Sequence, residues 1–242
     1  MWLFNKKAAS LEDSGMLDGL TDWHSHVLPG VDDGIKTIED SLEVLRHFEA
    51  KGVRTLWLTP HIMEDYPNTT AKLRDRFEEL RKAWDGKEEL CLAAENMLDS
   101  LFEERLAARD LLPIGKNADH LLVETSYFSP PMGMDSMIDS IMSAGYYPLL
   151  AHPERYTYMD ESHYNRLRQK GVRMQLNYVS LVGGYGETAR KKSVWLLKNG
   201  YIDVVGSDVH RLKSNQTLIA ARPSKKEHLD MILGIVKDKN RI

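Results

Sequence analysis

Seven apolar segments alternate with helix-like segments along almost the whole chain, and this alternation limits the fold more than any other feature. The segments that read as strands are residues 21–27, 54–59, 90–95, 120–125, 147–152, 172–177 and 202–207. Several are almost continuously apolar, as the strands of a parallel sheet covered by helices are. The pattern therefore predicts an α/β fold, and both an open doubly wound sheet and a closed barrel satisfy it.

The stretches between these strands have the periodicity of amphipathic helices. They cover residues 38–51, 71–84, 97–108, 134–144, 164–170, 188–198 and 225–236. Gly52, Gly145 and Gly171 are expected to stop three of them, because glycine readily adopts the backbone conformation that ends a helix. No Gly-x-Gly-x-x-Gly sequence follows a strand and no Walker-type loop is present, which disfavours nucleotide-binding folds.

Composition narrows the class of protein further. The net charge is −4 and no long basic run is present, which disfavours a nucleic-acid-binding protein. Cys91 is the only cysteine, so the chain can form no internal disulfide and no cysteine-rich zinc site, and we expect a cytoplasmic protein. No apolar run is long enough to span a membrane. We expect residues 1–19 to form an N-terminal leader, able to touch a membrane surface or a partner, and residues 20–242 to form a single domain.

Side chains of the kinds that bind metals follow the predicted strands. His24 and His26 share one face of the first segment, because side chains alternate along a strand, and Asp32 and Asp33 follow in its loop. Five later strands end in residues of the same kinds, namely His61, Glu95, Glu124, His152, Asp208 and His210. A single histidine at a strand end is more often structural. Here six of the seven predicted strands carry such residues at or just after their ends. This indicates one shared site, because the C-terminal ends of the strands of a parallel barrel meet at one face.

Five histidines and four carboxylates make up the predicted ligand set: His24, His26, Asp33, His61, Glu95, Glu124, His152, Asp208 and His210. A single zinc ion needs about four ligands, so nine suffice for two or three ions. Imidazole and carboxylate without thiolate suit Mn, Fe or Zn better than a soft metal. Three divalent ions would leave this pocket positively charged, which attracts a phosphate dianion. Arg155 and Arg211 are the expected phosphate contacts.

These residues match the motifs of a known family. His24-Ser25-His26, Thr59-Pro60-His61, Glu95, Glu124, His152-Pro153-Glu154-Arg155-Tyr156 and Asp208-Val209-His210 resemble the motifs of the polymerase-and-histidinol-phosphatase (PHP) superfamily. Within that superfamily, the stretch from His24 to Gly34 resembles the bacterial capsule-associated, manganese-dependent tyrosine phosphatases of the CpsB/YwqE type. The resemblance covers residues 20–235.

The resemblance implies a distorted TIM-like (β/α)7 barrel of the PHP type that holds three divalent metals. Mn²⁺ is the expected metal, with Fe, Zn or Mg as alternatives. The resemblance matches all nine ligands and selects Asp33 rather than Asp32 from the aspartate pair. The implied activity is hydrolysis of phosphotyrosine on the tail of a bacterial tyrosine kinase that controls capsular or exopolysaccharide biosynthesis. A hydroxide that bridges the metals is expected to attack phosphorus.

The resemblance also makes Arg155 the phosphate-contacting arginine. In the family a second arginine follows the Asp-x-His motif by several residues. Here Arg211 follows at once, and Lys213 and Asn215 stand at the later positions.

Other functions are compatible with the same residues. One is a small-molecule phosphatase such as a histidinol-phosphate phosphatase, and another is a nuclease-like PHP domain, which the acidic charge disfavours. A third is a non-catalytic, metal-stabilised interaction module. A metal amidohydrolase is disfavoured because no strand end presents a lysine. A cysteine-based tyrosine phosphatase needs an arginine six residues after its cysteine, and Met97 stands there.

Overall fold

The structure is a computed structural model that describes residues 8–238 and Ile242. Its strands are β1 (Thr21–Asp22), β2 (Thr55–Leu58), β3 (His61–Ile62), β4 (Glu89–Leu92), β5 (Glu95–Met97), β6 (His120–Glu124), β7 (Tyr147–Ala151), β8 (Arg173–Asn177) and β9 (Val204–Gly206). Its helices are α1 (Ile38–Ala50), α2 (Thr70–Ala83), α3 (Ser100–Ala108), α4 (Met134–Ser143), α5 (Glu161–Gln169), α6 (Gly186–Lys198), α7 (Leu212–Ile219) and α8 (Lys226–Lys237). Three 3-10 turns are η1 (Glu12–Ser14), η2 (Pro153–Arg155) and η3 (Tyr178–Val182).

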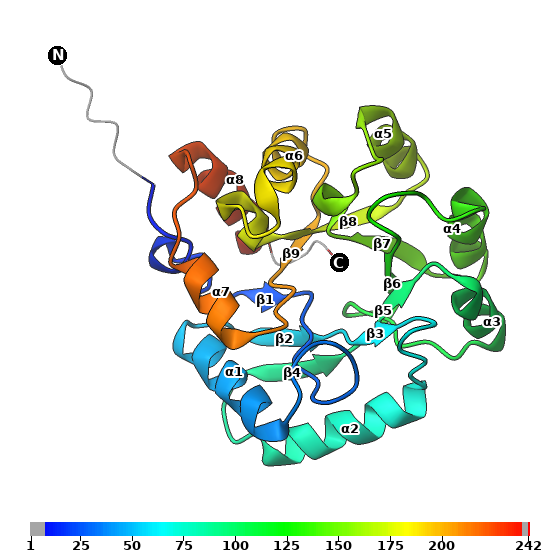
Figure 1. Ribbon diagram of the computed structural model, residues 1–242, viewed down its shortest axis with the longest axis horizontal. Helices are drawn as coiled ribbons and strands as arrows, with labels where there is room; N and C mark the ends of the chain where they lie inside the picture. The colour runs from blue at the N-terminus through cyan, green and yellow to red at the C-terminus, as the bar shows by residue number, and fades with distance from the viewer. Residues whose placement is uncertain (1–7, 239–241) are drawn as a thin grey trace.

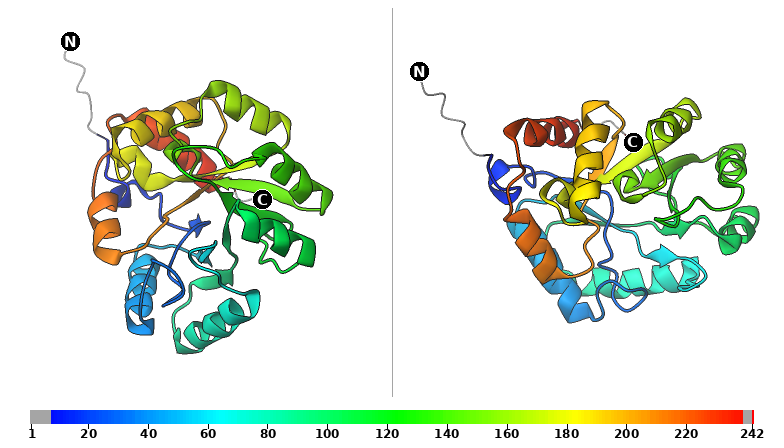
Figure 2. Two further views of the ribbon diagram at one scale, coloured as in Figure 1. Left: turned by 45° about the vertical axis from the view of Figure 1, so that its right-hand side comes forward. Right: turned by 45° about the horizontal axis from the view of Figure 1, so that its top comes forward.

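The strands form a closed parallel barrel, and the helices surround it (Figures 1 and 2). Two sheets, in the orders β1-β2-β4 and β3-β5-β6-β7-β8-β9, make up the wall. The chain after β1 joins them, because the Trp23 N–H donates to the Val205 carbonyl and Ser25 forms a parallel bridge with Val209. The expected distorted (β/α)7 barrel is therefore confirmed, and the open sheet is excluded.

Two of the seven predicted strand segments are each followed by a further short strand. β2 lies within the second segment and β3 just beyond its end, and β4 covers the first half of the third segment while β5 begins at its last residue. Pro60 lies between β2 and β3, and a proline has no N–H to donate to a neighbouring strand. The Glu95 N–H still donates to the Pro60 carbonyl, so the barrel wall remains continuous across the break.

The barrel has an apolar interior as well as an apolar layer under the helices. On β6, Leu121 and Val123 belong to the outer core, whereas Leu122 belongs to the inner cluster. That inner cluster consists of Ala93, Ile114, Leu122, Leu149, Ala151 and Val204. Because side chains alternate along a strand, Glu124 shares the inward face with Leu122 and lies at the C-terminal end of β6. The fold therefore turns a carboxylate into the mouth of the barrel.

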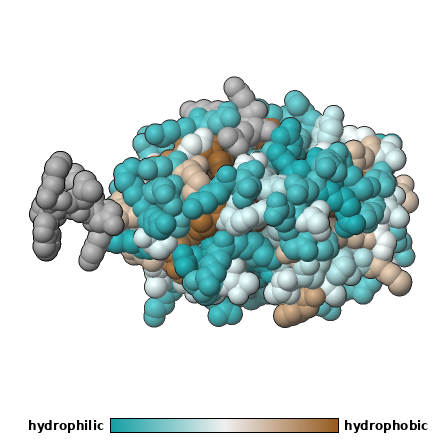
Figure 3. Space-filling view, turned by 90° about the horizontal axis from the view of Figure 1, so that it is seen from above, coloured by the Kyte–Doolittle hydropathy of each residue, from teal (hydrophilic) through white to brown (hydrophobic). Residues whose placement is uncertain are grey.

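The predicted helices agree with the observed ones to within a turn, except that α7 had no counterpart in the prediction. Gly52, Gly145 and Gly171 have positive φ angles of 88°, 92° and 88°, as expected for residues that stop helices. No helix of the described residues is long and apolar enough to cross a membrane. Figure 3 shows one face of the molecule, where hydrophilic residues prevail and a hydrophobic strip lies over the half that carries α6 and α8.

The segment before β1 packs onto the barrel from residue 8 onward. Leu11, Met16 and Leu17 are buried in the main core, and the Leu11 N–H donates to the Ala221 carbonyl. The part of the predicted leader that covers residues 1–7 lies outside the described residues. The division of the chain at residue 20 stays a prediction.

Candidate metal centre

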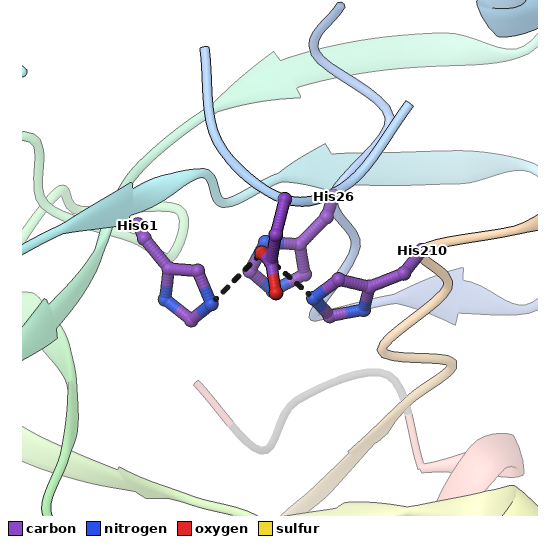
Figure 4. A group of neighbouring side chains, drawn as sticks. His26, His61 and His210 are labelled. Atoms are coloured by element: carbon purple, nitrogen blue, oxygen red, sulfur yellow. Dashed lines mark ion pairs between the residues drawn. The ribbon is translucent and has the colours of Figure 1, made fainter. Parts of the chain in front are cut away.

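All nine predicted ligand residues meet at the C-terminal ends of the strands. Their ligand atoms form four overlapping groups, and within each group the atoms lie within 4.8 Å of one another. The groups are His26, Asp33, His61 and His210; His24, Glu95 and His152; His24, His26 and Asp208; and His61, Glu95 and Glu124. Figure 4 shows His26, His61 and His210 turned toward one another, and its dashed lines mark ion pairs of two of these rings. Asp33 Oδ1 lies 3.5 Å from His61 Nε2 and 3.4 Å from His210 Nε2.

Glu95 occupies the centre of this cluster and is fully buried. Its Oε2 lies 3.1 Å from His24 Nε2 and 3.2 Å from His26 Nε2. The same oxygen lies 3.1 Å from His61 Nδ1, and Oε1 is 2.8 Å from His152 Nε2. One carboxylate therefore faces four imidazoles, which is the position of a ligand that bridges cations.

Three buried polar atoms of the cluster test whether these residues suit a metal. His61 Nδ1, Glu95 Oε2 and Glu124 Oε1 have no hydrogen-bond partner in the part of the chain that the structure describes. Yet His61 Nδ1 lies 3.1 Å from both oxygens. Leaving one buried polar atom unpaired costs about 1–3 kcal/mol. A divalent cation bound by all three would remove this cost, so the donor set fits a metal.

The charges in the cluster depend on one another. Burial by itself lowers the pKa of His24, but the carboxylates of Glu95 and Asp208 raise this pKa to about 9. Burial likewise raises the pKa of Glu95, but the imidazoles of His24 and His61 hold it well below its usual range. The carboxylates thus require positive charge beside them. Metal ions would supply that charge in place of imidazole protons, because a histidine must be neutral to bind a metal.

Two side chains outside the predicted ligand set fix the ring nitrogens of the His-x-His pair. His24 Nδ1 lies 2.8 Å from Gln175 Oε1, and His26 Nδ1 lies 2.8 Å from Asp32 Oδ2. In each ring the proton on Nδ1 is held by this contact, so Nε2 carries no proton and can face the cluster as a ligand atom, because the hydrogen bond on one nitrogen sets the tautomer. Asp32 also accepts the N–H groups of Gly34 and His61, at 2.9 and 3.0 Å. Asp32 therefore lies behind His26 and not among the ligand atoms.

The sequence offers only the position of Gln175 as a cue and not its residue type. β8 belongs to the one predicted strand that ends without His, Asp or Glu, and its last inward positions are instead Gln175 and Asn177. The Gln175 amide donates to Asn177 Oδ1 at 3.0 Å, and the Asn177 amide donates to Asp208 Oδ2 at 2.7 Å. Amides two residues apart at a strand end thus connect two predicted ligands.

The backbone is closely packed and strained around the cluster. A Cβ atom at Gly34 would lie 2.3 Å from the His26 carbonyl oxygen, and one at Gly206 would lie 2.6 Å from the His24 Cβ. His152 and Asp208 have positive φ angles of 32° and 53°. Such conformations cost about 1–3 kcal/mol each and occur mainly at functional sites.

Arg155 lies between two aromatic rings beside the cluster. Its guanidinium carbon is 4.2 Å from the ring centroids of both Tyr127 and Tyr185. Its Nη1 donates to Asp208 Oδ2 at 2.9 Å, and the Tyr185 hydroxyl donates to the same oxygen at 2.7 Å. Burial lowers the pKa of Arg155, but Asp208 together with Tyr127, Tyr185 and Glu95 raises it by more, so the side chain stays charged.

A cavity of about 330 Å³ lies beside the cluster and is lined by Asp33, Arg155, Tyr185, Asp208, His210 and Arg211, among others. The Asp33 and His210 side chains are 52% and 27% exposed, so the otherwise buried cluster meets solvent here. Both predicted phosphate-contacting arginines reach this cavity, whereas Lys213 does not line it. A larger cavity, of about 480 Å³, lies at the N-terminal ends of the strands and contains none of the predicted ligands.

A parallel barrel that gathers imidazoles and carboxylates at the C-terminal ends of its strands has the architecture of a metal-dependent hydrolase. Residues 20–225 match the family described as capsular polysaccharide synthesis, CpsB/CapC, and the chain belongs to that family. It is 31% identical over 202 residues to the tyrosine-protein phosphatase YwqE of Bacillus subtilis (strain 168), which covers 81% of this chain and 79% of that protein.

Two further comparisons agree with this family. The chain is 29% identical over 208 residues to the tyrosine-protein phosphatase CpsB of Streptococcus pneumoniae, which covers 81% of this chain and 84% of that protein. Crystal structures of YwqE from Bacillus subtilis and CpsB from Streptococcus pneumoniae are described as those of metal-dependent tyrosine phosphatases. The structure of this chain matches a chain from that work with a TM-score of 0.76 and 28% sequence identity. The match covers 88% of this chain and 86% of the solved chain.

Proposed function

We propose that this chain is a metal-dependent protein-tyrosine phosphatase that acts in the cytoplasm. Its proposed substrate is phosphotyrosine on the tail of a bacterial tyrosine kinase that controls capsular or exopolysaccharide biosynthesis. One observation carries the proposal: the nine-residue cluster opens into a cavity that two arginines line. Membership of a capsular polysaccharide synthesis family supports the biological setting.

The four ligand groups overlap, and Glu95 belongs to two of them. We expect three divalent ions, since nine ligands that share a central carboxylate suffice for that number. The donor set contains imidazoles and carboxylates and no thiolate, which suits Mn, Fe or Zn, and the resemblance to the manganese-dependent phosphatases favours Mn²⁺ among them. When bound, such ions lower the pKa of coordinated water and neutralise phosphoryl oxygens.

The protein side chains bind and orient the substrate. The cation-π contacts of Arg155 with Tyr127 and Tyr185 fix its guanidinium plane at the cavity wall, where it can bind phosphoryl oxygens in the fork geometry of arginine. Arg211 supplies a second positive charge to the same cavity. Val179, Val209 and Leu218 line the cavity as well and provide apolar contacts for the phenyl ring of phosphotyrosine. Hydrolysis breaks the bond between phosphorus and the tyrosyl oxygen, and no protein nucleophile is required.

The proposal is tested by metal removal and reconstitution. The purified protein is treated with a chelator and assayed on p-nitrophenyl phosphate, a phosphotyrosine peptide and histidinol phosphate, with Mn²⁺, Fe²⁺, Zn²⁺ or Mg²⁺ restored one at a time. We expect no turnover without metal, the best recovery with Mn²⁺, and preference for the phosphotyrosine peptide over histidinol phosphate.

A matched pair of variants identifies the site. His24→Ala combined with His26→Ala should abolish turnover, whereas His47→Ala, on helix α1 and outside the four groups, should leave it unchanged. Activity that persists after complete metal removal, or in the double variant, would exclude the mechanism. Faster turnover of histidinol phosphate would identify a small-molecule phosphatase. A metal-loaded protein that turns over no phosphoester would instead favour an interaction module.

A further inference from the structure

The loop that follows β6, residues 126–133, starts beside the metal cluster and exposes large apolar side chains. The Phe128 side chain is 79% exposed and the Met132 side chain is 95% exposed. These are the two highest exposed fractions among the large hydrophobic side chains of the described residues. β6 ends at Glu124, one of the predicted ligands, so this loop begins at the mouth of the barrel. Apolar surface exposed beside a catalytic cleft commonly marks a binding surface.

A cavity of about 250 Å³ adjoins the far part of the same loop. It is lined by Pro130, Pro131, Met134, Tyr158, His163 and Leu167, among others. The two prolines fix their own φ angles, which reduces the conformational entropy that this part of the loop loses when a partner binds. Asp135 and Arg166 also line this cavity and pair with each other at 3.3 Å. The wall is therefore charge-balanced, which favours an apolar occupant over a charged one.

A row of aromatic rings connects this cavity with the proposed phosphate-binding arginine. The ring of Tyr127 lies 4.2 Å from the guanidinium carbon of Arg155. The Tyr127 and Tyr156 centroids are 6.1 Å apart, and those of Tyr156 and Tyr158 are 5.9 Å apart. Tyr158 in turn lines the 250 Å³ cavity. Tyr156 is fully buried, so this row runs beneath the surface. The loop itself continues the site, because Tyr127 belongs to the loop and contacts Arg155.

We propose that the loop 126–133 and the adjoining cavity form a docking surface for the peptide segment that carries the phosphotyrosine. The surface binds an apolar or aromatic side chain that lies within a few residues of the phosphorylated tyrosine. This inference rests on the proposed phosphatase function. An extended peptide spans about 3.3–3.6 Å per residue, so the five loop residues from Phe128 to Met132 match a substrate segment of at most about five residues.

The test compares two substrates on matched variants of the metal-loaded protein. The first substrate is p-nitrophenyl phosphate, which has no peptide, and the second is a short phosphotyrosine peptide with leucine or phenylalanine beside the phosphotyrosine. Phe128→Ser combined with Met132→Ser should lower kcat/KM for the peptide about tenfold, as for the loss of an apolar contact at an interface, and leave kcat/KM for p-nitrophenyl phosphate unchanged. Met142→Ser, which removes an exposed methionine on α4, is the matched control and should change neither value.

Binding provides a second readout that does not depend on turnover. Fluorescence anisotropy with a labelled peptide that carries a non-hydrolysable phosphonate in place of the phosphate should show about tenfold weaker binding to the double variant. A peptide with alanine at the flanking positions should bind wild type and double variant alike. Equal losses on both substrates, or unchanged binding of the apolar peptide, would overturn the docking surface. A wild-type protein that hydrolyses neither substrate would instead overturn the proposed function on which the inference rests.

Discussion

Replacing Asp32 by asparagine tests whether this residue supports the metal cluster without being a ligand. Asp32 Oδ2 accepts from His26 Nδ1–H and from the His61 N–H, and Oδ1 accepts from the Gly34 N–H. An asparagine has one acceptor oxygen. If that oxygen keeps the two contacts of Oδ2, the amide NH₂ group faces the Gly34 N–H, and a buried donor loses its acceptor.

The size of the effect follows from the lost contact. A hydrogen bond to a charged acceptor contributes about 1.5–3 kcal/mol, so we expect the free energy of unfolding of metal-free Asp32→Asn to fall by about 2 kcal/mol. The remaining amide oxygen still accepts from His26 Nδ1–H, but it lacks the charge of the carboxylate. Metal affinity should therefore fall by about 10–100-fold, the usual effect of changing a residue that supports a ligand. Turnover should recover at saturating metal concentration.

The neighbouring residue provides the control. Asp33 is half-exposed, and its carboxylate faces His61 and His210 in the cluster. Asp33→Asn should change the stability of the metal-free protein by less than about 0.5 kcal/mol, but its turnover should not recover fully with added metal. Urea unfolding, competition with a chromophoric chelator and activity as a function of Mn²⁺ concentration measure the three quantities. Wild-type stability and metal affinity in Asp32→Asn, or equal destabilisation in both variants, would refute the assignment.

Three further predictions concern other parts of the molecule. Arg155→Lys keeps a positive charge but loses the planar fork between Tyr127 and Tyr185, so kcat/KM for p-nitrophenyl phosphate should fall by about 100-fold in steady-state assays. Chelation of the metal-loaded protein should lower the Tm by about 5–10 °C in scanning calorimetry, because a ligand at 100 times its Kd contributes about 2.7 kcal/mol. Both carboxylate oxygens of Glu88 are buried without a hydrogen-bond partner among the described residues, and burial raises the pKa of Glu88 to about 9. Between about pH 5 and pH 9 the folded state then holds a proton that the unfolded state has released, so stability should decrease as pH rises, and Glu88→Gln should reduce this slope in urea unfolding.

Each of these predictions has an outcome that contradicts it. An Arg155→Lys enzyme within twofold of wild type would show that the planar fork is dispensable. Equal melting temperatures with and without chelator would mean that the cluster binds no metal in the folded state. Equal pH slopes for wild type and Glu88→Gln would mean that the Glu88 carboxyl does not retain its proton on folding.

Local patterns predicted the alternation of strands and helices and the composition of the cluster, whereas the closed barrel, rather than an open sheet, came from the family resemblance. In a parallel barrel the strands end at one face, so a polar residue that directly follows an apolar run is placed at that face whatever the chain separation. His61, Glu95 and Glu124 lie together for this reason. The distinction between Asp32 and Asp33 came from a family motif, and the structure gives it a physical basis in the hydrogen bond of Asp32 to His26.

Contacts between distant segments could not be predicted in this way. Gln175 contacts His24 across 151 positions in sequence, and no periodicity connects the two residues. Glutamine at a strand end has many structural roles, so its type indicates no metal site. Helix α7 was missed because its eight residues are few for a periodic signal and its N-cap residue, Arg211, makes no side-chain capping hydrogen bond.

The surroundings of Arg155 explain why an arginine rather than a lysine suits this position. Within the described residues, the guanidinium donates one hydrogen bond, from Nη1 to Asp208, although it has five N–H donors. Tyr127 and Tyr185 cover its two faces, so its remaining donors can reach partners only through its edge. The Arg155 side chain lines the cavity into which the metal cluster opens. Asp208 therefore anchors one end of the guanidinium while its other oxygen faces the imidazoles, and the free edge stays available for a phosphate at a fixed position relative to the metal ligands.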